Sequence, residues 1–97
     1  MSRRNGLTGS QEEFLDILAE EAAGIIQIVS KIKRFGYESR CTRTGIPNRE
    51  LLEMEIGDFE HLKERLIRQG ELRKNAIEAA KKYKEEKIEN WLRAYPI

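Results

Sequence analysis

The sequence feature that most constrains the fold is LAEEAAGIIQIVSKIKRFG, residues 18–36, in which apolar side chains recur every three or four residues. This spacing places them on one face of a helix. The stripe expected to form the core comprises Phe14, Leu18, Ala22, Ile25, Val29 and Ile32. A neighbouring line reads Phe14, Ile17, Glu21, Gly24 and Ile28. Glu21 therefore stands where an apolar residue would continue the line, beside Glu20, and such a carboxylate is costly unless its charge is compensated.

A second helical pattern follows about thirty residues later, in LLEMEIGDFEHL, residues 51–62. Its apolar face is predicted to comprise Leu52, Ile56, Phe59, Leu62 and Leu66. Glu55 and Asp58 are three residues apart, so both side chains leave the helix on one side, in a row with Leu51 and Leu62. The same conflict between acids and an apolar row appears on both helices, and conflicts of this kind are typical of functional sites.

Boundary signals divide the chain into three helices. Thr8 or Ser10 can cap the first helix and Asn48 the second, while Gly36 and Gly70 are suited to end them. The intervening GYESRCTRTGIP has two glycines, a proline and no sustained periodicity, which is typical of a loop. We predict helices over residues 10–36, 48–69 and 72–94, in one domain over residues 8–94 that follows a flexible tail over residues 1–7.

These elements predict an all-α fold, a small helical bundle built on the antiparallel pair 10–36 and 48–69 plus a C-terminal helix. A 97-residue chain with 39% hydrophobic residues buries a modest core. Ordering its backbone costs roughly 1–2 kcal/mol per residue. We therefore expect oligomerisation to complete the bundle.

The charge pattern excludes several classes of function. The formal net charge is +1, and in KKYKEEK the lysines alternate with glutamates, so the chain lacks the positive field that nucleic acid binding needs. MSRRNG is followed by no apolar signal segment, and no run of about 20 apolar residues occurs. We expect a cytoplasmic protein without membrane or nucleic-acid partners. Cys41 and His61 lack the companions that a zinc site requires.

Packing the two acidic rows against each other would bring up to four carboxylates into one small volume, those of Glu20, Glu21, Glu55 and Asp58. Repulsion and desolvation would raise their pKa values, and a hard divalent cation would relieve the repulsion. Ligation by oxygen alone favours Mg²⁺ or Mn²⁺ over zinc. A magnesium ion with open positions typically binds phosphate oxygens, which makes a nucleotide the expected ligand.

Basic side chains are the candidates to bind the remaining phosphate charge, namely Arg34, Arg40, Arg43, Lys84 and Lys87. The spacing alone leaves a simpler interpretation open, because charged residues at helical spacing most often form a solvated face.

The segments LAEEAAGIIQIVSKIKRFG and LEMEIGDFEHL together resemble the all-α nucleotide pyrophosphohydrolases of the MazG-like kind, especially short phage members. In that family an EExxE motif on one helix and an ExxD motif on the next bind Mg²⁺, and water is directed at a nucleoside triphosphate to release pyrophosphate. The resemblance spans most of residues 11–92. It includes the KxxRFG helix end formed by Lys31, Arg34, Phe35 and Gly36, and the lysine-rich helix that ends in Trp91.

The resemblance implies a role for each matching acid. Glu20 and Glu21 match the first two acids of EExxE, and Glu55 and Asp58 match ExxD, so all four are expected metal ligands. Glu21 and Glu55 are the expected catalytic residues. The resemblance also implies a dimer or tetramer, and a phage origin would place the protein in the host cytoplasm.

Gly24 stands where the family has its third glutamate, and it has no side chain to bind a metal. Gln27, one turn along, could supply a neutral oxygen. Three functions stay open. The protein is a Mg²⁺-dependent nucleotide pyrophosphohydrolase, a nucleotide-binding or sequestering relative with weak or no chemistry, or a helical interaction module whose acids lie on its surface.

Overall fold

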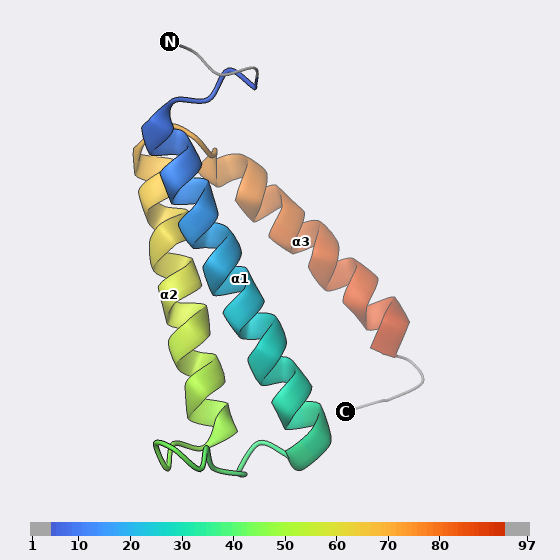
Figure 1. Ribbon diagram of the computed structural model, residues 1–97. Coiled ribbons are helices and arrows are strands. Elements are labelled where there is room, and N and C mark those ends of the chain that lie inside the picture. Colours follow the sequence, from blue (N-terminus) through green and yellow to red (C-terminus); the bar gives the residue numbers. More distant parts are fainter. Residues whose placement is uncertain (1–4, 93–97) are drawn as a thin grey trace. The chain divides into compact units, whose positions relative to one another are not determined.

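The structure is a computed structural model that describes residues 5–92. It contains three helices, α1 (Gly9–Phe35), α2 (Asn48–Arg68) and α3 (Lys74–Trp91), as Figure 1 shows. Between residues 5 and 92 the chain forms no strand, and an isolated bridge joins Arg40 to Pro47. The predicted all-α helical bundle is confirmed. None of the described helices is long and apolar enough to cross a membrane.

Both ends of α1 and α2 and the start of α3 lie within two residues of the predicted ones, and α3 ends at Trp91. The first helix begins and ends one residue earlier than predicted, α2 ends one residue earlier, and α3 begins two residues later. Residues 1–4 of the predicted tail and residues 93–94 of the predicted third helix lie outside the described residues.

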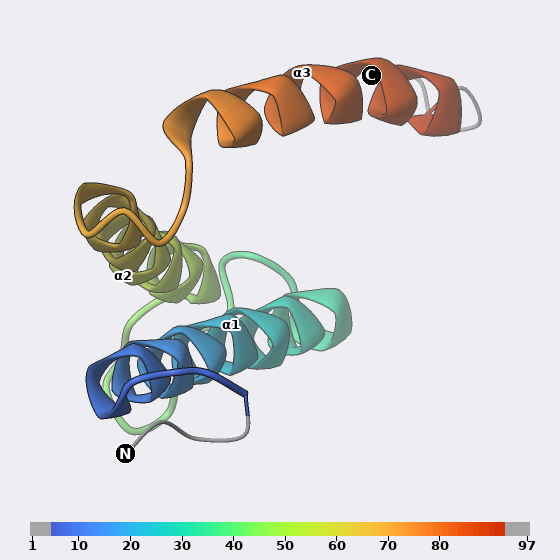
Figure 2. The ribbon, with the colours of Figure 1, turned by 90° about the horizontal axis from the view of Figure 1, so that it is seen from above.

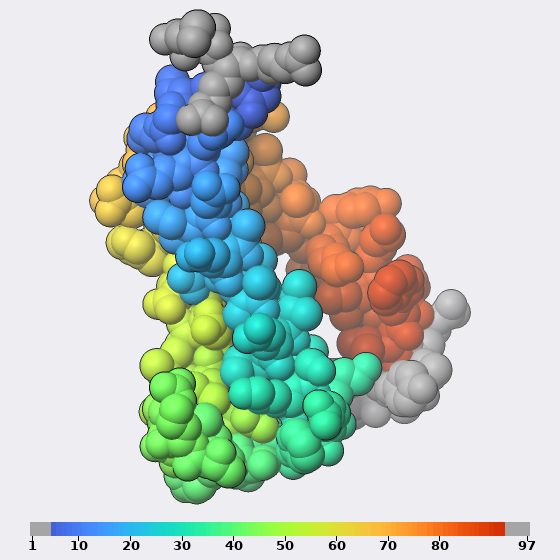
Figure 3. Space-filling model, in the orientation of Figure 1, coloured from blue at the N-terminus to red at the C-terminus, as the bar shows by residue number. Residues whose placement is uncertain are grey.

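The chain divides into two compact units after Glu64. The first unit contains α1, the loop that follows it and α2 as far as Glu64; the second contains the end of α2 and α3. Within the first unit, α1 and α2 lie side by side in two perpendicular views (Figures 1 and 2). In the space-filling view, the atoms of α1 cover part of α2 (Figure 3). Each unit therefore has its own internal packing.

A capping box fixes the start of α1. The Thr8 side chain accepts a hydrogen bond from the Gln11 backbone N–H at 3.1 Å, and the Gln11 side chain accepts one from the Thr8 N–H at 2.8 Å. Two backbone donors that the helix itself leaves unsatisfied thus gain partners. Of the two predicted caps, Thr8 is the one used.

A hydrogen-bonded loop ties the end of α1 to the start of α2. Gly36 has a φ of 92°, a conformation that glycine adopts at little cost, and its N–H donates to the Ile32 carbonyl. Asn48 is buried, and its side-chain amide donates to the Gly36 carbonyl at 3.2 Å, while the Arg49 N–H donates to the Tyr37 carbonyl. These bonds hold the neighbouring ends of α1 and α2 together.

The line of α1 that faces inward differs from the predicted stripe. Ile28 is buried, whereas Val29, which the stripe includes, is 41% exposed. The buried and half-buried positions at alternating spacings of four and three are Phe14, Leu18, Glu21, Ile25, Ile28 and Ile32. This is the spacing that keeps one line of a helix against a neighbouring helix. The prediction for Val29 is wrong, because the inward line passes through Ile28 at this turn, although Phe14, Leu18, Ile25 and Ile32 belong to both the predicted stripe and the inward line.

The part of α2 that belongs to the first unit also has one line of residues that faces inward. Its inward line is Asn48, Leu52, Glu55, Phe59 and Leu62, again at alternating spacings of four and three. Ile56, which the sequence places on the apolar face, is 45% exposed, so that prediction is also wrong. In each helix, the third member of the inward line is a glutamate, Glu21 or Glu55, and the members on either side of it in sequence are apolar.

Candidate metal centre

Three carboxylates converge in the first unit, one from α1 and two from α2. One ligand atom from each of Glu21, Glu55 and Asp58 can be chosen so that all lie within 4.8 Å of one another. The inward lines explain this convergence. Glu21 and Glu55 occupy inward positions of packed helices, and Asp58 is three residues after Glu55, which places it on the adjacent turn. Glu21 and Glu55 are half-buried and Asp58 is exposed, so the cluster is open to solvent on one side.

The environment of Glu21 favours its protonated form. Its pKa is raised above the ordinary 4.5, first by desolvation, then by a hydrogen bond with Glu55, and then by the charges of Asp58, Glu55 and Glu20. Each cause acts against a negative charge at this position. A cation placed among these carboxylates would remove the repulsive part of the shift, because it would favour the ionised form.

The raised pKa of Glu21 predicts a pH dependence in metal-free protein. A carboxyl whose pKa is higher in the folded state than in the unfolded state stabilises the fold below its unfolded pKa, and this contribution is lost as the pH rises through the folded pKa. We therefore expect the wild type to lose stability relative to Glu21→Gln as the pH rises from about 4.5. Denaturation with urea in EDTA at a series of pH values measures this difference.

The matched condition for this titration is saturating Mg²⁺. Metal binding requires the ionised carboxylate, so Mg²⁺ should restore wild-type stability at the upper end of the pH series and leave Glu21→Gln less affected. A difference between the two proteins that stays constant across the series would contradict the raised pKa.

Gly24 lies directly beneath the carboxylate of Glu55. A Cβ atom built on Gly24 would lie 2.6 Å from Oε2, 2.8 Å from Cδ and 2.9 Å from Oε1 of Glu55. Real Cβ atoms do not approach heavy atoms this closely, so the Glu55 carboxylate occupies the space that a side chain at position 24 would need. Gly24 is the position at which the resemblance to the MazG-like family leads one to expect a third glutamate. Its contact with Glu55 depends on the position of the partner helix, which no pattern within α1 reveals.

Other predicted site residues of the first unit lie outside the three-carboxylate group. Glu20 is exposed, and it acts on the cluster through its charge, which contributes to the raised pKa of Glu21. Gln27 is exposed on α1. Arg34 is exposed, with its guanidinium 4.9 Å from the centre of the Phe35 ring. The side chain of Arg40 forms a hydrogen bond within the loop, in which its Nη1 donates to the Gly45 carbonyl at 2.8 Å.

Lys84 and Lys87, two of the predicted phosphate-binding residues, belong to the second unit, whereas the three carboxylates belong to the first. Each ammonium lies over an aromatic ring of α3. Lys84 Nζ is 5.3 Å from the Trp91 ring centre, and Lys87 Nζ is 5.6 Å from that of Tyr83. Both contacts are within the range of cation–π attraction.

The loop gives Cys41 a property that the sequence does not reveal. The pKa of its thiol is lowered to about 7, first by a hydrogen bond from the Thr44 side chain and then by the backbone N–H groups of Thr44 and Arg43. Lys31 adds a smaller electrostatic contribution. The lowered pKa makes the thiolate of Cys41 more accessible at neutral pH than that of an ordinary cysteine. Within the described residues this is the one cysteine.

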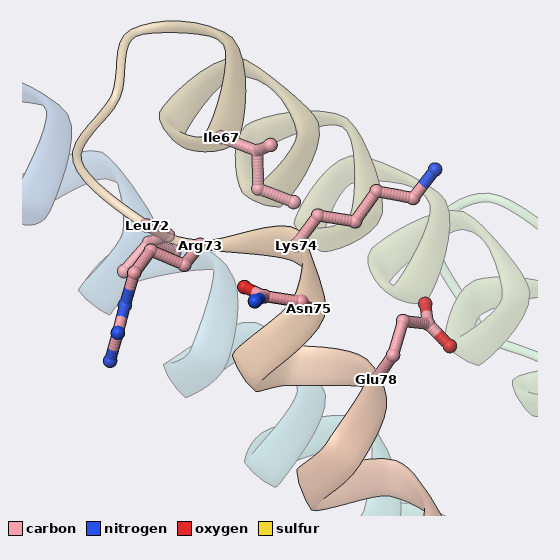
Figure 4. A pocket seen from close by; sticks show the side chains of 6 residues that line it. All are labelled: Ile67, Leu72, Arg73, Lys74, Asn75 and Glu78. Atoms are coloured by element: carbon pink, nitrogen blue, oxygen red, sulfur yellow. The ribbon is translucent and has the colours of Figure 1, made fainter.

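A shallow pocket lies in the second unit, at the turn between α2 and α3 (Figure 4). It is lined by Ile67, Leu72, Arg73, Lys74, Asn75 and Glu78. Two cations and one acid among these six residues provide no ligand set for a divalent metal. The carboxylate cluster of the first unit is therefore the stronger candidate for a functional site.

Comparisons of the chain with protein-family models, with curated proteins and with solved structures return no match.

Proposed function

We propose that this protein is a Mg²⁺-dependent nucleotide pyrophosphohydrolase, which converts a nucleoside triphosphate or a related nucleotide to the monophosphate and pyrophosphate. The observation that carries the proposal is the convergence of Glu21, Glu55 and Asp58 from two helices onto one volume. The resemblance of the two acidic helices to MazG-like pyrophosphohydrolases supplies the reaction. The cluster supports it because three of the four acids that match the family motifs lie together.

The donor set fits Mg²⁺ or Mn²⁺. It consists of carboxylate oxygens only, which hard divalent cations prefer. The pKa of Glu21 is raised by desolvation, by the hydrogen bond with Glu55 and by repulsion from the neighbouring acids, and a cation would relieve the repulsion. Glu21, Glu55 and Asp58 would hold the ion. When bound, it supplies positive charge to phosphate oxygens and makes water more acidic.

In the proposed reaction, the oxygen of a water molecule forms a bond to the α-phosphorus of the nucleotide. The bond between that phosphorus and the oxygen that bridges to the β-phosphorus breaks, and pyrophosphate leaves with the bridging oxygen and the bonding electrons. Glu21, which is ionised when the cation is bound, accepts the proton of the water. Glu55 and Asp58 complete the ligand set beside Glu21, and Arg34 is the first unit's candidate for a phosphate contact.

The test is product analysis after the full chain is incubated with a panel of nucleotides and Mg²⁺. Monophosphate and pyrophosphate in equal amounts are expected, and EDTA should abolish both.

Gly24, which leaves three converging carboxylates in place of four, favours a second candidate, a protein that binds nucleotides without turnover. That candidate predicts no product but a raised melting temperature with Mg²⁺ and nucleotide, since a ligand at 100 times its dissociation constant adds about 2.7 kcal/mol of stability. An unchanged melting temperature would favour an interaction module.

The proposal includes an antiparallel α1–α2 pair and a homo-oligomer, a dimer or tetramer, that completes the core. Supporting this, the buried apolar side chains of the described chain are Ile28, Leu62 and Leu66, whereas Phe35 and Met54 are more than half exposed. If assembly completes the core, dilution should lower the melting temperature. A melting curve independent of protein concentration would argue for a monomer.

A further inference from the structure

We propose that Gly24 is a positioning residue of the carboxylate cluster. Because Gly24 has no side chain, the Glu55 carboxylate packs directly against its backbone, and we call this contact the seat of Glu55. The seat holds the three carboxylates close enough together to bind a single divalent cation. The role of the cation rests on the proposed function, whereas the contact between Glu55 and Gly24 rests on steric distances alone. It gives Gly24 a role of its own, in place of that of a lost ligand.

The contact distances define the seat. Both oxygens and the carboxyl carbon of Glu55 lie between 2.6 and 2.9 Å from where a Cβ of residue 24 would stand. Any side chain there, even the methyl group of alanine, must displace the Glu55 carboxylate. Since the Glu55 carboxylate is the far end of a flexible side chain, it can rotate away, and the backbone need not move. A substitution at Gly24 should therefore preserve the helix and open the cluster.

The position of Gly24 on its helix makes this seat specific to the cluster. Gly24 follows Glu21 by three residues, so both lie on the side of α1 that faces Glu55. Glu55 resting on Gly24 is thereby held within hydrogen-bonding reach of Glu21. Three carboxylate oxygens within 4.8 Å of one another can surround one ion, whereas a pair of ions about 3.5–4 Å apart would call for further ligands.

The chain supplies a matched control for the test. Gly57 is also a glycine inside a helix, but a Cβ built on it meets no atom within 4 Å. Gly24→Ala and Gly57→Ala both replace a helical glycine by alanine, which favours the helix. They differ in whether the new methyl group collides with Glu55.

Titration of the full-length proteins with Mn²⁺ by calorimetry measures affinity and stoichiometry. One ion per chain is expected for the wild type and for Gly57→Ala with equal affinity, and Gly24→Ala should bind at least about 10-fold more weakly, as sites do when a ligand loses its orientation. Equal affinity in all three proteins, or two ions per wild-type chain, would overturn the inference. A wild type that binds no Mn²⁺ would refute the proposed metal site.

A double-mutant cycle, with melting temperatures measured in EDTA, tests the contact between Glu55 and Gly24 without metal. In the wild-type background, Gly24→Ala should raise the melting temperature less than Gly57→Ala does, because the methyl group must displace Glu55. In a Glu55→Ala background the two substitutions should raise it equally. If the effect of Gly24→Ala is the same in both backgrounds, Glu55 does not rest on Gly24, and the inference fails whether or not the protein binds a metal.

Discussion

Glu55→Gln should reduce Mg²⁺-dependent release of pyrophosphate by at least about 100-fold. Loss of an outer partner of a metal ligand already costs about 10–100-fold in affinity or activity, and Glu55 is a proposed direct ligand. The substitution keeps the size of the side chain and removes its charge. It also removes the Glu55 charge that contributes to the raised pKa of Glu21. Initial rates of pyrophosphate formation at saturating Mg²⁺ measure the effect.

Glu53→Gln is the matched control for Glu55→Gln. Glu53 lies two residues away on the same helix, is exposed, and is not one of the three clustered acids. It loses the same charge, so a general electrostatic effect would slow both variants equally. We expect Glu53→Gln to retain the wild-type rate. Activity that survives in Glu55→Gln would exclude the carboxylate cluster as the catalytic site.

Ile28→Ala should lower the free energy of unfolding by about 2–5 kcal/mol, the range for removal of a buried aliphatic side chain. Ile28 is 8% exposed and lies on the inward line of α1, between Ile25 and Ile32. Because the buried apolar set is small, this loss is a large fraction of the stability that a domain of this size has, about 5–15 kcal/mol. Urea denaturation monitored by circular dichroism measures it.

Ile26→Ala is the matched control, since it makes the same substitution in the same helix at a side chain that is 69% exposed. Its expected effect lies within about 0.5 kcal/mol of zero. Both variants should be measured at a protein concentration where dilution no longer changes the melting curve, so that a contact between copies does not contribute. Equal destabilisation by both substitutions would contradict the inward line described for α1.

The sequence predicted the three helices, both ends of α1 and α2 and the start of α3 to within two residues, because capping residues and glycines mark helix ends locally, as Thr8 and Gly36 do. It was less successful in choosing the buried line. Lines of side chains spaced by three and four residues lie next to one another on a helix, and only the position of the partner helix decides between them. This is why the sequence pattern predicts Val29 and Ile56 in the core, although both are exposed, and assigns the buried Ile28 to the neighbouring line.

For the candidate site, too, the sequence predicts features that are marked within one helix and misses those that depend on contacts between two helices. The structure brings together Glu21, Glu55 and Asp58, which interrupt apolar rows in the sequence, whereas Glu20 lies outside the cluster. Consecutive helical residues point about 100° apart, so both acids of the Glu20–Glu21 pair cannot face the same helix. The contact of Gly24 with Glu55 depends on two helices at once, and no pattern within either helix could predict it.

The hydrogen-bonded loop also bears on the order in which the first unit can assemble. The bond from Asn48 to Gly36 joins residues 12 apart, whereas Glu21 and Glu55 are about 34 residues apart. Each doubling of the chain segment to be closed costs about 0.6 kcal/mol of additional entropy, so contact at the loop is reached more easily than contact at the acids. Once the loop is closed, every further turn of pairing brings α1 and α2 together over a short remaining distance. By then the closed loop has fixed the alignment of α1 against α2, so the mutually repelling carboxylates meet after a search over few remaining conformations.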